Sequence, residues 1–434
     1  MGRRRKHAPL VVYLNGHMVG RLNRQSSGAV DFQYDAAWLD WEHTQPISLS
    51  LPLREDRYIG APVLAVFDNL LPDSDAIRRR MAERVGAEGI DAFSLLSSVG
   101  RDCVGALQFL PEGNPPGPAG TIDAEPISED EIERLLNNLA AAPLGLGDDQ
   151  DFRISLAGAQ EKTALLFWDG RWHRPHGTTA TTHILKPQIG RLPNGPDLSN
   201  SVENEFFCLK LTAALGLPSA NVEIADFGTT RTLVVERFDR VHARDGRLLR
   251  RPQEDCCQAL GVAPTRKYQS EGGPGIVDIL ALLNGADDPE RDRALFLKAQ
   301  IVFWLLAATD GHAKNFSIRL SPGGRFSLAP LYDVISVQPS LASHHLQRKA
   351  CKLAMSVGRS HHYRVDEITL RHFIETGAKA GMGQAAVERI FTELLSETNT
   401  AIDGVISALP VEFPQDIAIQ ITEGMHRRLP RLKS

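Results

Sequence analysis

The sequence predicts an α+β fold in which strand-rich segments come first and a mainly helical part follows. Three observations support this prediction. Apolar and polar residues alternate on both sides of Asn15-Gly16, which is typical of a β-hairpin. Between residues 151 and 250, short strand-like runs surround one helical segment. Beyond residue 250, most apolar residues recur at helical spacing.

The chain length of 434 residues favours several packed units over a single domain. The stretch PEGNPPGPAG, from Pro111 to Gly120, has the composition of a linker. A capping box at Ser128-Glu-Asp-Glu131 opens a short amphipathic helix that we expect to reach about Ala142. We therefore predict four regions: an N-terminal subdomain (1–110), a linker with a short helix (111–150), a strand-rich lobe (151–250) and a helical lobe (251–434).

The periodicity of apolar residues locates the individual elements. In the N-terminal subdomain we expect, after the hairpin, a strand at 47–53 and helices within 67–84 and at 92–99. In the strand-rich lobe we expect strands at 154–156, 164–168, 183–185, 222–225 and 233–235, with a helix at 202–215 that Gly216 ends. In the last lobe we expect helices at 275–283, 291–309, 366–380 and 383–402.

Composition argues against some classes of protein. The net charge of −5 does not fit a chain that binds nucleic acid through a strongly basic surface, so we interpret the basic ends, Arg3 to Lys6 and Arg427 to Lys433, as solvated tails. Five irregularly spaced cysteines predict free thiols in a reducing cytoplasm. We see no signal peptide, and the longest apolar stretch, Ile301 to Ala308, is too short to span a bilayer. We therefore expect a cytoplasmic protein without a membrane segment.

The strongest chemical signal is TDGHAKN at residues 309–315, which follows an apolar helical stretch and precedes a short strand. An Asp and an Asn five residues apart in such a loop have the spacing of a kinase catalytic loop, where the Asp accepts the proton of the attacking hydroxyl and the Asn holds Mg²⁺. Asp310 is therefore the candidate base and Asn315 a candidate metal ligand. Because Asp-Gly is also a common turn, a purely structural role stays open.

A second carboxylate follows downstream, at Asp333 in the run APLYDVI. It comes after the short strand that begins at Phe326, which is where a kinase places its second metal-binding carboxylate. Mg²⁺ prefers oxygen ligands, and Asp333 with Asn315 and ATP phosphates would supply them. The alternative is that Asp333 caps a helix beginning at Val334.

On the nucleotide side, THILKP places Lys186 at the end of a predicted strand. A kinase needs such a lysine to pair with the α- and β-phosphates and a glutamate to orient it. Glu203 and Glu205 in the next helix are both candidates, and we favour Glu205. The alternative for Lys186 is the common one for a lysine, an exposed surface position.

Two further segments fit a nucleotide site. The run VVERFDR, at 234–240, leaves a strand, and its backbone could bind the adenine edge. The run SLAGAQEKT, at 155–163, has small residues that let backbone N–H groups face phosphates. It matches neither G-x-G-x-x-G nor a Walker A motif, so a plain hairpin loop remains the alternative for 155–163. For 234–240 the alternative is an ordinary strand end.

These segments together resemble the HipA family of proteins in the same order along nearly the whole chain. In the second half they are FRISLAGAQEKT (152–163), THILK (182–186), VERFDR (235–240), RPQED (251–255), GGPG (272–275), DGHAKNFS (310–317) and LYD (331–333). In the N-terminal subdomain they are FDNLLPD (67–73) and SVGRDCVG (98–105).

The resemblance implies a two-lobed protein-kinase-like fold with an extra N-terminal subdomain. It also implies a bacterial serine/threonine kinase toxin that uses ATP and Mg²⁺ and acts on a cellular protein, such as an aminoacyl-tRNA synthetase, to cause growth arrest and persistence. The implied partner is a HipB-like helix-turn-helix antitoxin, through which the complex would bind operator DNA. The implied ATP-binding residues are Ala157, Gly158, Ala159, Gln160, Glu161, Lys162, Lys186, Glu236, Phe238, Gln253, His312 and Tyr332, with Asp310 as base and Asn315 and Asp333 as metal ligands.

The resemblance gives Ser155 a regulatory role, because HipA proteins autophosphorylate the serine at this motif position and thereby eject the neighbouring phosphate-binding loop. A phosphoserine adds a charge of about −1.5 to −2 beside the place where ATP phosphates must dock. The alternative is a structural serine in a turn.

Two other functions remain open. A small-molecule phosphotransferase of the aminoglycoside-kinase type shares the arrangement of Asp310, Asn315 and Asp333 but does not explain the serine-bearing loop or the N-terminal subdomain. A non-catalytic corepressor scaffold, acting with an antitoxin, does not explain why all the chemical residues are present. Whether protein or small molecule accepts phosphate would separate these classes.

Overall fold

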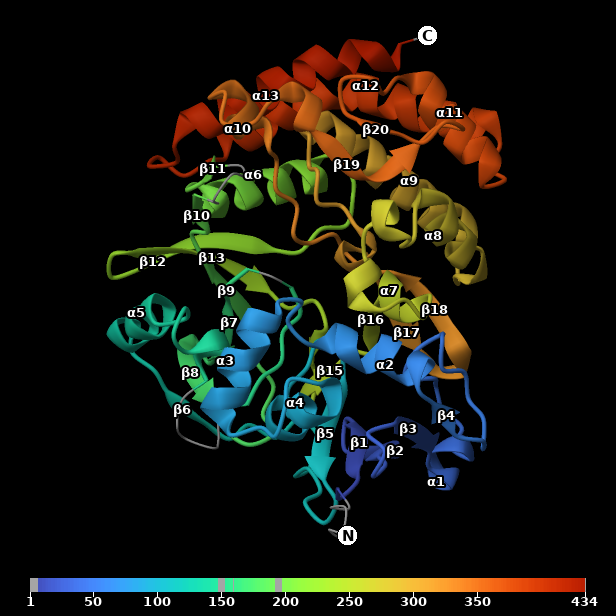
Figure 1. Ribbon diagram of the computed structural model, residues 1–434. Helices are drawn as coiled ribbons and strands as arrows, with labels where there is room; N and C mark the ends of the chain where they lie inside the picture. Colours follow the sequence, from blue (N-terminus) through green and yellow to red (C-terminus); the bar gives the residue numbers. More distant parts are fainter. Residues whose placement is uncertain (1–6, 147–152, 159, 192–196, 434) are drawn as a thin grey trace.

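The computed structural model describes residues 7–146, 153–158, 160–191 and 197–433. In Figure 1 the N-terminal unit (blue) lies at the bottom beside a strand-rich lobe (mainly green), and a helical lobe (yellow to red) lies above. The predicted α+β, two-lobed kinase-like fold with an N-terminal subdomain is confirmed.

The N-terminal unit contains an antiparallel five-stranded sheet in the order β4-β3-β2-β1-β5. The predicted hairpin is present, because Asn15 and Gly16 both have positive φ, as the favoured two-residue turn requires. The strands are β1 (Leu10–Leu14), β2 (His17–Arg24), β3 (Val30–Tyr34), β4 (Tyr58–Ile59) and β5 (Leu107–Pro111). The main helices are α2 (Ala61–Phe67), α3 (Asp75–Val85) and α4 (Ala92–Val99).

The predicted strand at 47–53 is wrong, because side chains rather than a neighbouring strand pair with its backbone. The N–H of Ile47 donates to the Tyr34 hydroxyl at 3.0 Å, and the N–H of Leu49 donates to the Glu254 carboxylate at 2.8 Å. Burial does not follow the alternation either, because the polar Ser48 is fully buried whereas Leu49 and Leu53 are only partly buried.

Two other predicted elements differ in detail. The predicted strand at 154–156 forms a single bridge to Asp102, where the Ser155 N–H donates to the Asp102 carbonyl at 2.9 Å. The helical spacing over 67–84 is broken by Leu71 to Asp73, which separates a 3₁₀ turn from α3. This break places residues of the N-terminal unit beside the interlobe cleft.

The strand-rich lobe is a six-stranded antiparallel sheet in the order β12-β13-β9-β7-β8-β6. Its strands are β6 (Ala124–Pro126), β7 (Thr163–Trp168), β8 (Arg171–Pro175), β9 (His183–Pro187), β12 (Val222–Phe227) and β13 (Thr230–Glu236). The predicted capping box at Ser128 is present and opens α5 (Glu129–Asn137), which ends before Ala142. The predicted helix α6 (Ser201–Ala214) packs against β12 and β13, and Gly216 follows it at φ 76°.

The helical lobe surrounds α9, whose second half is almost entirely buried. The four predicted helices are present, and α13 is an additional one: α8 (Ile276–Leu282), α9 (Pro289–Leu306), α11 (Leu370–Lys379), α12 (Gln384–Ser407) and α13 (Gln415–Arg428). A three-stranded sheet carries the loops that face the cleft, with β16 (Gln253–Asp255), β17 (Ser317–Ser321) and β18 (Arg325–Leu328).

The basic C-terminal end is not a solvated tail. The guanidinium of Arg428, at the end of α13, is buried and donates to the Leu305 carbonyl at 2.7 and 3.0 Å and to Gln338 Oε1 at 3.0 Å. Arg3 to Lys6 lie outside the described residues. The predicted free thiols are confirmed, since all five cysteines are unpaired and buried. Within the described ranges, no helix has the length and apolar character needed to cross a membrane.

A buried carboxylate ties the N-terminal unit to the strand-rich lobe. Asp102 accepts hydrogen bonds from the guanidinium groups of Arg237 (3.3 Å), Arg240 (2.8 Å) and Arg250 (2.9 Å). All four side chains are buried. Burial alone would raise the pKa of Asp102, but the three cations hold that pKa well below its ordinary value. Asp102 is therefore anionic and compensates the buried arginines.

Asp102→Asn should destabilise the fold by about 3–5 kcal/mol at pH 7, because removing one partner leaves buried charges uncompensated. Since the folded-state pKa is depressed, the stabilisation is present above the ordinary carboxyl pKa and is lost as pH falls below about 4. Chemical denaturation at pH 7 and at pH 3 measures both effects. Asp245→Asn, which removes an exposed partner of Arg247, is the control. Equal stability losses in the two variants would contradict the role of Asp102 as the compensating charge.

Candidate active site

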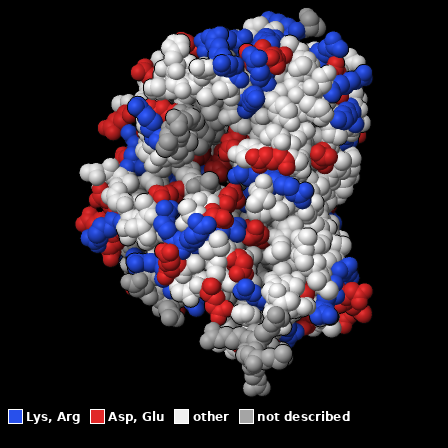
Figure 2. Space-filling view, viewed as in Figure 1, with Lys and Arg blue, Asp and Glu red and all other residues white. Residues whose placement is uncertain are grey.

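A cleft of about 520 Å³ lies between the strand-rich and helical lobes, and the N-terminal unit forms part of its wall. Figure 2 shows a hollow in this part of the surface with Asp and Glu side chains around it. Of the predicted site residues, the cleft is lined by Ala157, Gly158, Gln160, Lys162, Lys186, Glu236, Phe238, Gln253, Asp310, His312, Asn315, Tyr332 and Asp333.

Lys186 on β9 is a tightly held cation in the cleft. Its Nζ donates to Glu205 Oε1 at 2.8 Å and to Asp333 Oδ1. The ammonium is buried, so the exposed-surface alternative is wrong. Burial disfavours its charge, but Asp333 and Glu205 outweigh this and raise the pKa of Lys186. Lys186 is therefore a permanent cation.

The structure distinguishes the two candidate glutamates on α6. Glu205 faces β9 and reaches Lys186, whereas Glu203 accepts a hydrogen bond from Gln188 at 2.8 Å and pairs with Arg231 at 3.3 Å. Side chains two positions apart on a helix point in very different directions. Glu203 and Glu205 therefore cannot both serve the same lysine.

The loop that carries Asp310 begins where α9 ends at a left-handed Ala307, with φ 52°. Gly311 packs so closely that a β-carbon there would lie 2.5 Å from the Phe303 ring. The Asn315 Nδ2 donates to the Asp310 carbonyl at 2.8 Å, which fixes the loop and leaves the Asn315 Oδ1 available as a ligand atom. The side chain of Asp310 is 62% exposed and reaches into the cleft.

His312 lies beside this carboxylate. Its Nε2 is 3.9 Å from the Asp310 Oδ1, and its Nδ1 is buried without a hydrogen-bond partner among the described residues. Burial lowers the pKa of His312, which outweighs the opposite effect of Asp310. A neutral imidazole with an unpaired nitrogen is suited to a hydrogen bond with a bound ligand.

Asp333 is not a helix cap, because the next helix begins at Gln338. It adopts φ 57°, an uncommon backbone conformation for a residue other than glycine. Burial would raise the pKa of Asp333, but Lys186 and Lys162 lower it well below the ordinary range. The carboxylate therefore stays ionised, as a cation ligand must.

The predicted phosphate loop is only partly in the cleft. Lys162 is buried, and its Nζ donates to the Ala157 carbonyl at 3.1 Å. Gly158 has φ 106°, and a β-carbon there would lie 2.7 Å from that Nζ. Glu161 points outward and pairs with Arg80 at 3.7 Å, so it does not line the cleft. Ala159 lies outside the described residues.

Ser155 does not line the cleft either. It is fully buried, and its hydroxyl donates to the Leu70 carbonyl of the N-terminal unit at 2.8 Å. The serine is thus held inside a contact between two parts of the chain.

The end of β13 and the residues that follow it also line the cleft. The Glu236 N–H already donates to the Asn221 carbonyl at 3.0 Å, so a ligand would meet other main-chain atoms here. The Gln253 Oε1 is buried with no hydrogen-bond partner in the part of the chain that the structure describes. The Tyr332 hydroxyl donates to the Lys314 carbonyl at 2.7 Å and lies 2.6 Å from the Ser317 hydroxyl, which helps to hold the loop that carries Asp310 and Asn315.

Sequence reasoning missed the contribution of the N-terminal unit to the cleft. Asp73 pairs with Lys314 at 2.7 Å through Oδ1 and with Lys267 at 2.7 Å through Oδ2. Burial would raise the pKa of Asp73, but the two lysines lower it to about 2. The FDNLLPD run that contains Asp73 is a visible signal, but its distance along the chain from residue 314 hides the pairing.

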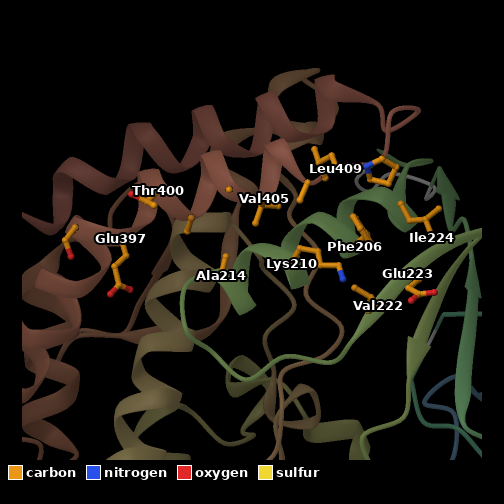
Figure 3. Close-up of a pocket in the computed structure, with 15 residues that line it drawn as sticks. Phe206, Lys210, Ala214, Val222, Glu223, Ile224, Glu397, Thr400, Val405 and Leu409 are labelled. Carbon is orange, nitrogen blue, oxygen red and sulfur yellow. The ribbon is translucent and has the colours of Figure 1, made fainter.

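A larger groove of about 930 Å³ lies elsewhere, between α6, β12 and α12. Figure 3 shows that it is lined mostly by apolar side chains such as Phe206, Ile224 and Val405, with Lys210 and Glu397 among them. It contains none of the predicted site residues. Size alone therefore does not identify the chemical site.

The interlobe cleft joins a lysine–glutamate pair on one lobe to an Asp–Asn loop and a second Asp on the other. This is the arrangement of a protein-kinase-like site. Comparison with protein families matches residues 10–110 to the HipA N-terminal domain and residues 154–402 to the HipA-like C-terminal domain. The chain belongs to the HipA family.

Individual relatives agree with this assignment. A protein of Sinorhizobium fredii named as a kinase, Y4mE, is 38% identical over 408 residues, covering 92% of this chain and 91% of its own length. The serine/threonine-protein kinase toxin HipA of Shewanella oneidensis is 28% identical over 348 residues, 76% of each chain. A chain of the Shewanella oneidensis complex of HipA, HipB and operator DNA superposes with a TM-score of 0.81 and 25% identity over 98% of each chain.

Asp73→Asn should lower the free energy of unfolding by about 2 kcal/mol at pH 7, which corresponds to the depression of the Asp73 pKa from 3.8 to about 2. The loss should diminish between pH 4 and pH 2, because the wild-type carboxylate becomes protonated there. Urea denaturation across this range measures it. Asp75→Asn, two residues further on in the first turn of α3, is the control. A loss that does not change with pH would show that the two ion pairs are not its cause.

Proposed function

We propose that this chain is the serine/threonine protein kinase of a HipA-type toxin–antitoxin system and transfers the γ-phosphate of ATP to a cellular protein. The observation that carries the proposal is the buried contact of Lys186 with Glu205 and Asp333, placed across the cleft from Asp310 and Asn315. The relatives named as kinases, which cover most of the chain, support the same conclusion.

The residues of the cleft fit ATP and Mg²⁺. ATP supplies the phosphoryl group, and Mg²⁺ neutralises charge on the phosphates when bound. The Asn315 Oδ1 and the ionised Asp333 provide the hard oxygen atoms that Mg²⁺ prefers. No cluster of three or more His, Cys, Asp or Glu suited to a metal occurs among the described residues, so phosphate oxygens and water would complete its coordination.

In this proposal Lys186 binds the phosphates, and Glu205 keeps its ammonium oriented after nucleotide enters. Lys162 adds a second cation close to the carboxylate of Asp333. Gln253 Oε1 and His312 Nδ1, which have no hydrogen-bond partner among the described residues, bind polar groups of the nucleotide. Asp310 is more exposed than Asp333 and Glu205. It accepts the proton of the incoming serine or threonine hydroxyl.

The proposed partner is a HipB-like helix-turn-helix antitoxin, supported by the similarity to a chain of the HipA, HipB and operator DNA complex. With a net charge of −5, this chain would meet operator DNA mainly through that antitoxin. The proposed substrate is a cytoplasmic protein, for example an aminoacyl-tRNA synthetase, whose modification would arrest bacterial growth and produce persistence.

Asp310→Asn and Asp333→Ala should each lower phosphoryl transfer by at least roughly 10²- to 10⁴-fold, because one removes the base and the other a metal ligand. The measurement is incorporation of labelled phosphate from MgATP into the purified protein and into a general acceptor, myelin basic protein. Asp245→Asn is the matched surface control. Near-wild-type transfer by either cleft variant would refute the role assigned to that residue.

A wild-type protein that binds ATP, starts unphosphorylated and transfers no phosphate to protein would overturn the kinase proposal. Transfer to an aminoglycoside in the same assay would instead identify a small-molecule phosphotransferase. ATP binding with no transfer to any acceptor would favour the corepressor scaffold.

Ser155 is proposed as an inhibitory autophosphorylation site. Its hydroxyl is fully buried against the Leu70 carbonyl, so a phosphate of about −1.5 to −2 charge cannot fit there without moving the segment. That segment leads directly into Gly158 and Lys162 in the cleft. Its displacement would therefore remove the phosphate loop.

Ser155→Ala should keep kinase activity constant during preincubation with MgATP, whereas wild-type activity should decline as Ser155 becomes phosphorylated. Mass spectrometry of Ser155 and activity sampled over the same time course measure both, and toxicity in cells should rise. Ser97→Ala, which removes a comparable hydroxyl-to-carbonyl bond in α4, is the control. Parallel decline in the wild type and in Ser155→Ala would contradict the proposed switch.

A further inference from the structure

A tyrosine is hydrogen-bonded to the carboxylate that the proposed reaction uses as its base. The Tyr268 hydroxyl donates to Asp310 Oδ1 at 2.6 Å. This distance lies in the range at which a general base binds the proton it removes. The phenol oxygen is therefore placed where the hydroxyl of an incoming serine or threonine must lie.

The backbone on both sides of Tyr268 is anchored. The Lys267 ammonium pairs with Asp73 at 2.7 Å, and the Lys267 carbonyl accepts a hydrogen bond from the Ala313 N–H at 3.4 Å. On the other side, Gln269 Oε1 accepts from the Ser356 N–H at 2.7 Å and from its hydroxyl at 3.1 Å. Both neighbours of Tyr268 are thus held in place, so displacement of the phenol would not require the segment to move.

Two glycines that follow Tyr268 in the chain allow the segment around it to pack closely. A β-carbon at Gly273 would lie 2.0 Å from the Arg266 carbonyl oxygen, and one at Gly275 would lie 2.5 Å from the Gln269 side chain. The GGPG run therefore packs the segment closely enough to direct Tyr268 toward the catalytic loop. The ring also meets the His312 ring edge-on, with centroids 4.9 Å apart.

We propose that Tyr268 guards the acceptor site: its hydroxyl fills the position of the substrate hydroxyl on Asp310, and a protein substrate enters by displacing the phenol. This inference rests on the proposed kinase function. It assigns the acceptor-binding position to the space between Tyr268, His312 and Asp310. The half-buried phenol has its pKa raised by burial and then by Asp310, so it stays protonated and remains a hydrogen-bond donor.

A guard and a positioning residue predict opposite effects of Tyr268→Phe. Phenylalanine keeps the ring against His312 and removes the hydroxyl. A guard that has lost its hydrogen bond should release Asp310, so that hydrolysis of MgATP by water should rise at least about tenfold, on the scale of one hydrogen bond to a charged group. The KM for myelin basic protein should fall, and the KM for ATP should stay unchanged.

The experiment compares the wild type, Tyr268→Phe, Tyr268→Phe/Asp310→Asn and Tyr363→Phe as full-length proteins. The double variant should lose the gained hydrolysis, and Tyr363→Phe, on β20 (His362–Arg364), should match the wild type. A fall in kcat in Tyr268→Phe, or unchanged kinetics, would overturn the guard. Phosphotyrosine at position 268 would also overturn it, because Tyr268 would then be an acceptor itself.

Nitration with tetranitromethane, mapped by mass spectrometry, tests the contact without relying on catalysis. Tyr268 should react slowly in the wild type and several-fold faster in Asp310→Asn, with Tyr363 as the internal reference. Phosphoryl transfer by a protein whose Tyr268 is unprotected would overturn the guard alone. Protection of Tyr268 in a protein that neither hydrolyses ATP nor transfers phosphate would overturn the kinase proposal and the acceptor-site role together.

Discussion

A buried ammonium group links the two lobes at the cleft. Lys186 belongs to β9, its partner Glu205 to α6, and its second partner Asp333 to the helical lobe. A buried cation is costly without anionic partners, so the three side chains must meet when the protein folds. The same requirement fixes a carboxylate from each lobe beside the place proposed for ATP phosphates.

The N-terminal unit contacts both lobes beside this cluster of charges. Asp102 joins the unit to the strand-rich lobe through three arginines, and Asp73 joins it to the loop at 310–315 through Lys314. Between these anchors, the Leu70 carbonyl holds Ser155. The unit therefore contacts both the loop proposed to bind phosphate and the loop proposed to carry the base. A modification that moved Ser155 would act on a joint shared by all three parts of the molecule.

Short-range patterns in the sequence predicted the parts of the site that lie within one loop or strand. Asp310, Asn315, Asp333 and Lys186 are spaced or placed locally, and the structure brings them to the same cleft. Long-range pairing could not be predicted in this way, which is why Asp73 was missed. The wrong strand at 47–53 has a related cause, because its backbone N–H groups pair with the distant side chains of Tyr34 and Glu254, which local alternation does not reveal.

Asp310 and Asp333 have different environments, and the difference suits the different tasks proposed for them. Asp333 is pressed against Lys186 and kept ionised, so it can hold a cation but has little freedom to meet a protein substrate. Asp310 is 62% exposed at the side of the cleft, and its hydrogen-bond donor is a phenol rather than an ammonium. A neutral donor is easier to displace than an ion pair. In the proposed kinase, a substrate hydroxyl could therefore replace Tyr268 on Asp310 without disturbing the charges that bind the nucleotide.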